Sequence, residues 1–81
     1  MIKVLFFGRL SDVSETLTCA LPHGVSTINA LSSWLGEENA ALGEALSAKG
    51  NRIAKNQQIV AIDATISDGD EIAFMSPLSG G

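Results

Sequence analysis

The 81 residues have room for one domain. With one cysteine and one histidine, they exclude an internal disulfide, a structural zinc site and a four-cysteine iron–sulfur cluster. The net charge of -4, with five scattered basic residues, also argues against the concentrated basic face that binds nucleic acid, so we expect no nucleic-acid partner. The core must be aliphatic, and the lack of a disulfide framework predicts a cytoplasmic protein.

The opening run of residues 2–7, "IKVLFF", predicts a central β-strand, because it is β-branched, aromatic and almost unbroken. Alternation places Ile2 and every second residue after it on one face, and Lys3 with its alternate neighbours on the other. The run is too short for a signal peptide or a membrane span, and Gly8 and Arg9 interrupt it. We therefore expect no membrane association.

The next segments predict a hairpin. Residues 8–15, "GRLSDVSE", have the composition of a turn. Residues 16–21, "TLTCAL", alternate Leu17, Cys19 and Leu21 with polar or small residues, which is typical of a half-buried strand paired with the first. Turn residues then follow in "PHGV".

The middle of the chain predicts two helices. Apolar residues recur at helical spacing from Ile28 to Leu35, with Ser26 as the expected N-cap and Gly36 as the expected end. A second short helix is expected over residues 40–48, where acidic residues near its start suit the helix dipole.

The last third returns to strands. Short strands are expected in residues 52–56 and 57–63, and an Asp-Gly turn at 68–69 precedes a strand over Glu71–Met75. The fold class is α+β, with one or two helices packed on one face of a small mixed sheet. We expect a domain over residues 1–76 and a flexible Gly-Gly tail over 77–81.

The internal residues give little sign of chemistry. His23 is expected in a solvated turn and Trp34 in packing, while Cys19 is expected to be a small buried hydrophobic residue. The acidic stretch of residues 68–71 does not match a calcium loop, and no glycine-rich phosphate loop occurs. We expect no bound metal or cofactor and no internal active site.

The segment Pro77 to Gly81, "PLSGG", is the remaining candidate. Glycine lacks Cβ, so its backbone enters channels too narrow for other residues. An unhindered terminal carboxylate can attack a nucleotide α-phosphate to give an acyl-adenylate, from which a sulfur donor can displace AMP and leave a thiocarboxylate. From composition alone, a frayed chain end explains these residues better than a working segment does.

The whole chain closely resembles the small subunits of molybdopterin synthase, the MoaD-type sulfur carriers. The resemblance lies in "MIKVLFF", Asn56-Gln57, "SDGDEIAF" over residues 67–74, Pro77 and the Gly80-Gly81 pair. It departs from the family at three positions, because Met75 replaces a common aromatic residue, Ser76 a second proline and Lys55 an apolar residue. The resemblance implies the β-grasp fold of ubiquitin.

The resemblance also implies a function and partners. An E1-like adenylating enzyme would use ATP to activate Gly81, and a sulfurtransferase would convert it to a thiocarboxylate. The large subunit would receive the tail and pass the sulfur to cyclic pyranopterin monophosphate, in a heterotetramer of two small and two large subunits. Gly81 carries the sulfur, and the residues expected to thread with it are Gly80, Ser79, Leu78 and Pro77.

An apolar patch on the exposed sheet face serves as the docking surface in this family. Ile59 and Met75 are the candidates for it here, and ordinary core positions are the alternative for both. A carrier for thiamine thiazole synthesis or tRNA thiolation would share the Gly-Gly end. A ubiquitin-like modifier, with Gly81 in isopeptide linkage to a lysine, and a plain interaction domain also stay open.

Overall fold

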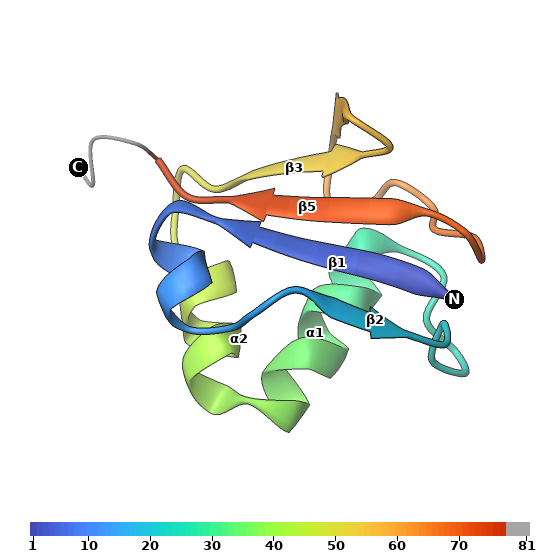
Figure 1. The fold of residues 1–81 in the computed structure, drawn as a ribbon, viewed down its shortest axis with the longest axis horizontal. Helices are drawn as coiled ribbons and strands as arrows, with labels where there is room; N and C mark the ends of the chain where they lie inside the picture. Colours follow the sequence, from blue (N-terminus) through green and yellow to red (C-terminus); the bar gives the residue numbers. More distant parts are fainter. Residues whose placement is uncertain (78–81) are drawn as a thin grey trace.

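Five strands form one mixed sheet in the order β2-β1-β5-β3-β4 in the computed structural model, which describes residues 1–77 (Figure 1). The strands are β1 (Ile2–Phe7), β2 (Leu17–Cys19), β3 (Arg52–Lys55), β4 (Gln58–Val60) and β5 (Glu71–Met75). The helices are the 3₁₀ helix η1 (Gly8–Asp12) and the α-helices α1 (Ile28–Glu38) and α2 (Ala40–Leu46). The predicted α+β class is confirmed.

The two central strands come from opposite ends of the chain. β1 and β5 pair in parallel, with Leu5 opposite Ala73, whereas all other pairs are antiparallel. The bounds predicted for β1 and β5 are confirmed, because in both strands buried residues alternate with more exposed ones. The strand predicted over residues 16–21 is shorter, since only Leu17–Cys19 pairs with β1.

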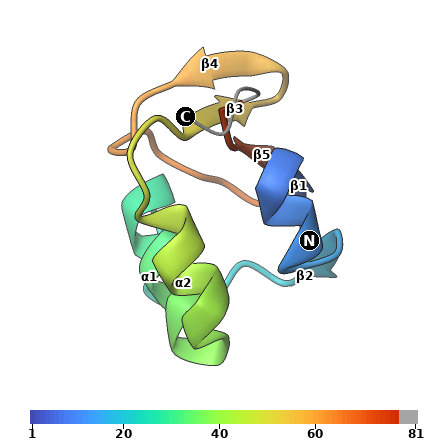
Figure 2. The same cartoon turned by 90° about the vertical axis from the view of Figure 1, so that its left-hand side faces the viewer.

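Both α-helices lie on one side of the sheet, as predicted (Figure 2). The core between the two layers is almost wholly aliphatic, with Phe6 and Phe74 stacked at 5.9 Å between ring centroids. No helix within residues 1–77 combines the length and apolar character needed to cross a membrane. The core residues of the cluster are Ile2, Val4, Phe6, Leu10, Val25, Ile28, Leu31, Leu35, Leu42, Leu46, Ile66, Ile72 and Phe74.

The N-cap of α1 is Thr27, so the prediction of Ser26 was wrong. Thr27 Oγ1 accepts the backbone N–H of Ala30 at 3.2 Å. The Ser26 carbonyl instead accepts the N–H of Ile66 at 2.9 Å, and Thr27 forms a bridge with Thr65. Pairing with residues 65–66 therefore holds Ser26 outside the helix.

The end of α1 was also predicted wrongly, because the helix continues past Gly36 to Glu38. Asn39 ends α1 and also caps α2, where its Oδ1 accepts the N–H of Leu42 at 3.1 Å. Gly36 instead faces Gly43 of α2, and a Cβ built on Gly36 would lie 3.1 Å from the Gly43 Cα. The glycines set the helix–helix distance, and α2 then ends at Leu46 instead of residue 48.

The segment of residues 8–15 is not simply a turn. It begins with η1, which buries Leu10 to 1% exposure under the sheet layer. Gly8 starts η1 in the left-handed region, with φ of 68°. This helix places Arg9 beside the end of β5, where the candidate site lies.

Candidate functional site

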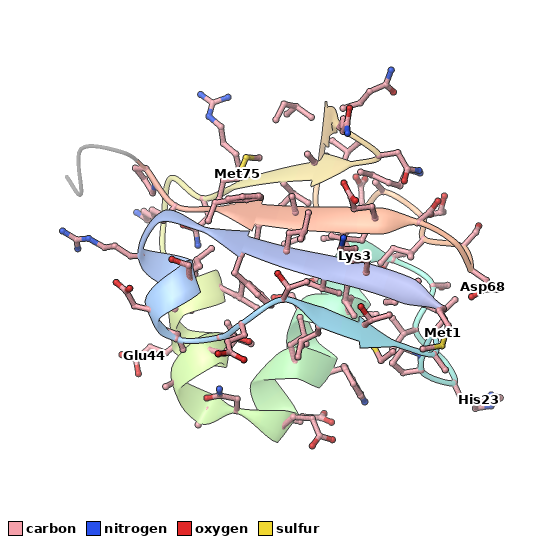
Figure 3. The ribbon with its side chains drawn as sticks, viewed as in Figure 1. Met1, Lys3, His23, Glu44, Asp68 and Met75 are labelled. Carbon is pink, nitrogen blue, oxygen red and sulfur yellow. The ribbon has the colours of Figure 1, made fainter. Side chains whose placement is uncertain are left out.

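The predicted sulfur-carrying segment begins where β5 ends. Pro77 lies within the described residues, whereas the predicted roles of Leu78, Ser79, Gly80 and Gly81 fall on residues outside them. We call Ser76 and Pro77 the tail root. It lies at the end of the sheet opposite Met1 and Asp68, which form an ion pair (Figure 3). The roles proposed for these residues as a threading path stay predictions.

The tail root is fastened to the segment after β1. Ser76 donates its backbone N–H to the Phe7 carbonyl at 3.3 Å, and Ser76 Oγ accepts the N–H of Arg9 at 2.7 Å. The Ser76 hydroxyl also lies 3.4 Å from the Phe7 carbonyl oxygen, to which it can donate. A Cβ on Gly8 would clash with Ser76 Oγ, so only glycine leaves room for this arrangement.

A second glycine borders the tail root from the other side. Gly50 has φ of 89°, and a Cβ there would come within 2.9 Å of Pro77 Cγ. Two left-handed glycines, one after β1 and one before β3, therefore approach the last two described residues. A side chain at either glycine would therefore displace the tail root.

The outer face of the sheet, away from the helices, carries an apolar patch. Its residues, which we call the outer patch, are Leu5, Phe7, Ala54, Ile59, Ala73 and Met75. Strand register sets Leu5, Ala73, Ala54 and Ile59 side by side across four strands, and Phe7 opposite Met75 beside them. They line a shallow hollow of about 440 Å³ together with Gln57 and Glu71.

Both sequence-predicted patch residues lie on this face. Ile59 is 62% exposed, and Met75 is half-buried. Neither belongs to the buried core, so the core alternative for them is wrong, while their contact with a partner stays a prediction. Phe7, 49% exposed, was not named as a patch residue, although the alternation in β1 had placed it on this face. Such exposed apolar patches mark interaction surfaces in soluble proteins.

The turn residues Asn56 and Gln57 have a structural role in this fold. Asn56 and Gln57 adopt left-handed conformations with φ of 51° and 70°. Asp70 accepts the N–H of Ser67 at 2.8 Å and the side-chain amide of Asn56 at 3.0 Å, and Asn56 Oδ1 accepts the N–H of Glu71 at 2.9 Å. These bonds join the β3–β4 turn to the start of β5.

The same bonds perturb the Asp70 carboxyl. Its pKa lies below the ordinary value, chiefly because the Ser67 N–H and then the Asn56 amide stabilise the carboxylate, with a smaller contribution from the charge of Lys55. Lys55 itself donates to the Thr65 carbonyl at 2.9 Å. This bond accounts for a lysine where the resemblance leads us to expect an apolar residue.

The other residues weighed for chemistry have ordinary surroundings. His23 projects from an exposed turn (Figure 3), and Cys19 and Trp34 are partly buried against the core. Within residues 1–77, no three His, Cys, Asp or Glu side chains gather as they would around a metal ion.

Similar proteins cover the whole chain. The Escherichia coli protein called molybdopterin synthase sulfur carrier subunit is 33% identical over 81 residues, all of each chain. The complex of subunits 1 and 2 of molybdopterin-converting factor from Helicobacter pylori contains a chain with TM-score 0.69 and 26% identity, over 99% of this chain and 97% of that one.

Haloferax volcanii SAMP1 has TM-score 0.81 and 23% identity, over 99% of this chain and 98% of that one. These neighbours identify the fold as the ubiquitin-like β-grasp. The ThiS family model matches residues 4–81, which include most of β1, the other four strands, both α-helices and the Gly-Gly segment. On this evidence the chain belongs to the ThiS family, and over its whole length it is similar to a molybdopterin synthase sulfur carrier subunit.

Proposed function

We propose that this protein is a sulfur carrier subunit of molybdopterin synthase. The observation that carries the proposal is the match over the full length of both chains to a relative with that name. The relation supports a shared role because it includes both the body that docks and the Gly-Gly segment. The described residues support it further, since the tail root directly follows Met75, a residue of the exposed apolar patch.

The proposed chemistry takes place on Gly81. An E1-like adenylating enzyme positions ATP, the Gly81 carboxylate attacks the α-phosphorus, and pyrophosphate leaves. Sulfide-level sulfur, released by a sulfurtransferase, then attacks the acyl carbon and displaces AMP, so that a thiocarboxylate remains. The body contributes binding and orientation to these steps, and ATP is bound by the activating partner.

The large subunit of the synthase is the proposed acceptor. The solved complex of subunits 1 and 2 from Helicobacter pylori supports a large-subunit partner, since its small chain has this fold. We assign the outer patch to that contact, because burying an exposed apolar surface is the usual driving force for association. The thiocarboxylate would then pass its sulfur to cyclic pyranopterin monophosphate in a heterotetramer of two small and two large subunits.

Intact-mass analysis of protein from its native host tests the carrier role. We expect a fraction in which one terminal oxygen is replaced by sulfur, and this fraction should vanish when the activating enzyme is deleted. A variant with one alanine added after Gly81 is the matched control: it should fold normally and never acquire sulfur. Wild-type protein that never carries the sulfur would refute the proposal.

Co-purification identifies the pathway. We expect the large subunit of molybdopterin synthase to be retained by the tagged protein. Retention of a thiazole synthase or a tRNA-thiolating enzyme in its place would show that the carrier serves another pathway. Isopeptide linkage of Gly81 to lysines would identify the protein as a ubiquitin-like modifier.

A further inference from the structure

A second hollow lies at the tail root, away from the outer patch. It has a volume of about 250 Å³ and lies between η1, the C-terminal end of α2 and Pro77. Figure 2 looks onto this end of the molecule, where η1 and α2 both face the viewer. We call it the root pocket; its lining is Arg9, Leu10, Ala45, Ala48, Lys49, Asn51, Ser76 and Pro77.

The root pocket has an apolar interior and a cationic rim. Leu10, Ala45, Ala48 and Pro77 supply the apolar surface, whereas Arg9 and Lys49 are exposed residues that line the same hollow. The lining contains no Asp or Glu, although the chain as a whole has a net charge of -4. Within residues 1–77, no ion pair involves either cation, since the one pair there joins Met1 to Asp68.

We propose that the root pocket receives an acidic segment of the protein that accepts the tail, with an Asp or Glu carboxylate between Arg9 and Lys49. This inference rests on the proposed function and names the chemistry of its partner. Pro77 forms part of the pocket wall, so a protein that binds the residues after Pro77 must approach this hollow. The outer patch and the root pocket would then both contact the partner, one on each side of the tail root.

The size and lining favour a protein side chain over a small molecule. Pockets for small ligands and cofactors usually span about 300–1,000 Å³, and this hollow is smaller. A free phosphate would pair with the cations but would leave the apolar surface uncovered. A carboxylate on a short stem, with an apolar neighbour, satisfies both parts of the pocket. Arginine and lysine at the edge of an interface also steer an acidic partner during encounter.

Charge reversal of Lys49 tests the proposal with the purified large subunit of molybdopterin synthase from the same organism. We expect Lys49→Glu to lower the association rate constant by roughly tenfold at low salt, because rim charges act mainly on association. The difference should shrink at about 0.5 M salt, where screening is strong. Lys55→Glu is the control: it changes the net charge equally but lies on β3, outside both the root pocket and the outer patch. Thermal unfolding checks that both variants fold.

A zero-length carbodiimide crosslink locates the contact directly. The reagent joins a carboxylate to the Lys49 amine with loss of water, so peptide mass spectrometry should find Lys49 bonded to an Asp or Glu of the large subunit. Lys49→Arg keeps the charge but has no amine to couple, so it should bind normally and give no such crosslink.

Each outcome separates this inference from the function on which it rests. If wild type binds the large subunit while Lys49→Glu and Lys55→Glu associate equally fast and Lys49 gives no crosslink, the root pocket is not the contact and the carrier role stands. If phosphate alone, rather than the large subunit, protects Lys49 from amine labelling, the pocket is an anion site and the proposal is wrong. If wild type does not bind the large subunit, both proposals fail together.

Discussion

The side-chain oxygen of Ser76 accepts the backbone N–H of Arg9 at 2.7 Å. This bond ties the end of the last strand to the first turn of η1, next to the place where β1 ends. A proline at residue 76 would have neither the hydroxyl nor the N–H that Ser76 donates to Phe7. The serine therefore holds the tail root with hydrogen bonds that a proline at this position could not make.

Gly8→Ala should destabilise the protein more than Gly24→Ala. Both glycines have positive φ, 68° and 83°, so both substitutions introduce backbone strain of about 1 kcal/mol. Only Gly8 also has Ser76 Oγ in the space that Cβ would fill, whereas nothing lies within 4 Å of that position at Gly24. Chemical denaturation measures the two free energies of unfolding.

The double variant Gly8→Ala/Ser76→Ala isolates the clash. Removing Oγ should recover part of the loss, so the two substitutions should couple favourably in a double-mutant cycle. Strict additivity would mean that Ser76 does not restrict residue 8.

Gly43→Ala should lower the free energy of unfolding by about 1–3 kcal/mol, because a Cβ there would lie 2.7 Å from the Gly36 Cα. Helix propensity alone predicts the opposite sign, a gain of about 1 kcal/mol. Gly36→Ala should have a smaller effect, since its Cβ would lie 3.1 Å from the Gly43 Cα. A rise in melting temperature for Gly43→Ala would show that α1 and α2 can move apart without loss of stability, and would contradict this prediction.

Ile59→Asp should weaken binding to the large subunit by about 2 kcal/mol or more, as loss of a large apolar contact does at interfaces. It should leave the unfolding transition nearly unchanged, because the side chain is 62% exposed. Ile62→Asp makes the same substitution at an isoleucine that is 49% exposed and lies outside the outer patch. Titration calorimetry compares the two variants. Equal losses for both would remove the outer patch from the contact.

Asp70→Asn should reduce stability at neutral pH, and its disadvantage should vanish in acid. The folded-state pKa of Asp70 is lowered, so its carboxylate stabilises the fold above the unfolded pKa, near 4. That contribution is lost as the pH falls below about 4 through the folded pKa. Urea midpoints from neutral pH to acid should converge for wild type and variant. Asp63→Asn makes the same substitution at an exposed carboxylate outside this hydrogen-bond network and is the variant with which the Asp70→Asn curve is compared. A pH-independent gap for Asp70→Asn would contradict this role of the charge.

The sequence predicted those elements whose signal is local. β1 and β5 follow strict alternation, and the two helices follow apolar spacing, so their existence could be predicted without a structure. Ser26 and Thr27 are neighbouring residues of equally good capping chemistry, and only the bridge of Thr27 to Thr65 decides between them. Gly36 looks like a helix end until Gly43 is brought against it.

The parts of the candidate site also differ in whether the sequence predicts them. The resemblance predicts Ile59 and Met75 as patch residues, alternation in β5 supports Met75, and both lie on the outer face. The root pocket was not foreseen, because η1, α2 and the tail root meet only in the folded chain. A 3₁₀ helix with one buried residue, Leu10, leaves almost no periodic signal in sequence.

The parallel pairing of β1 with β5 also governs when the chain can fold during synthesis. β5 lies between β1 and β3, so a nascent chain that has not reached Met75 lacks the middle of its sheet. Such long-range pairing forms late, since the separation of the two strands in sequence must be closed before any contact stabilises it. Chains that terminate before β5 should therefore stay unfolded and open to proteolysis. A folded domain thus implies translation through β5, which ends just before the predicted sulfur-carrying segment.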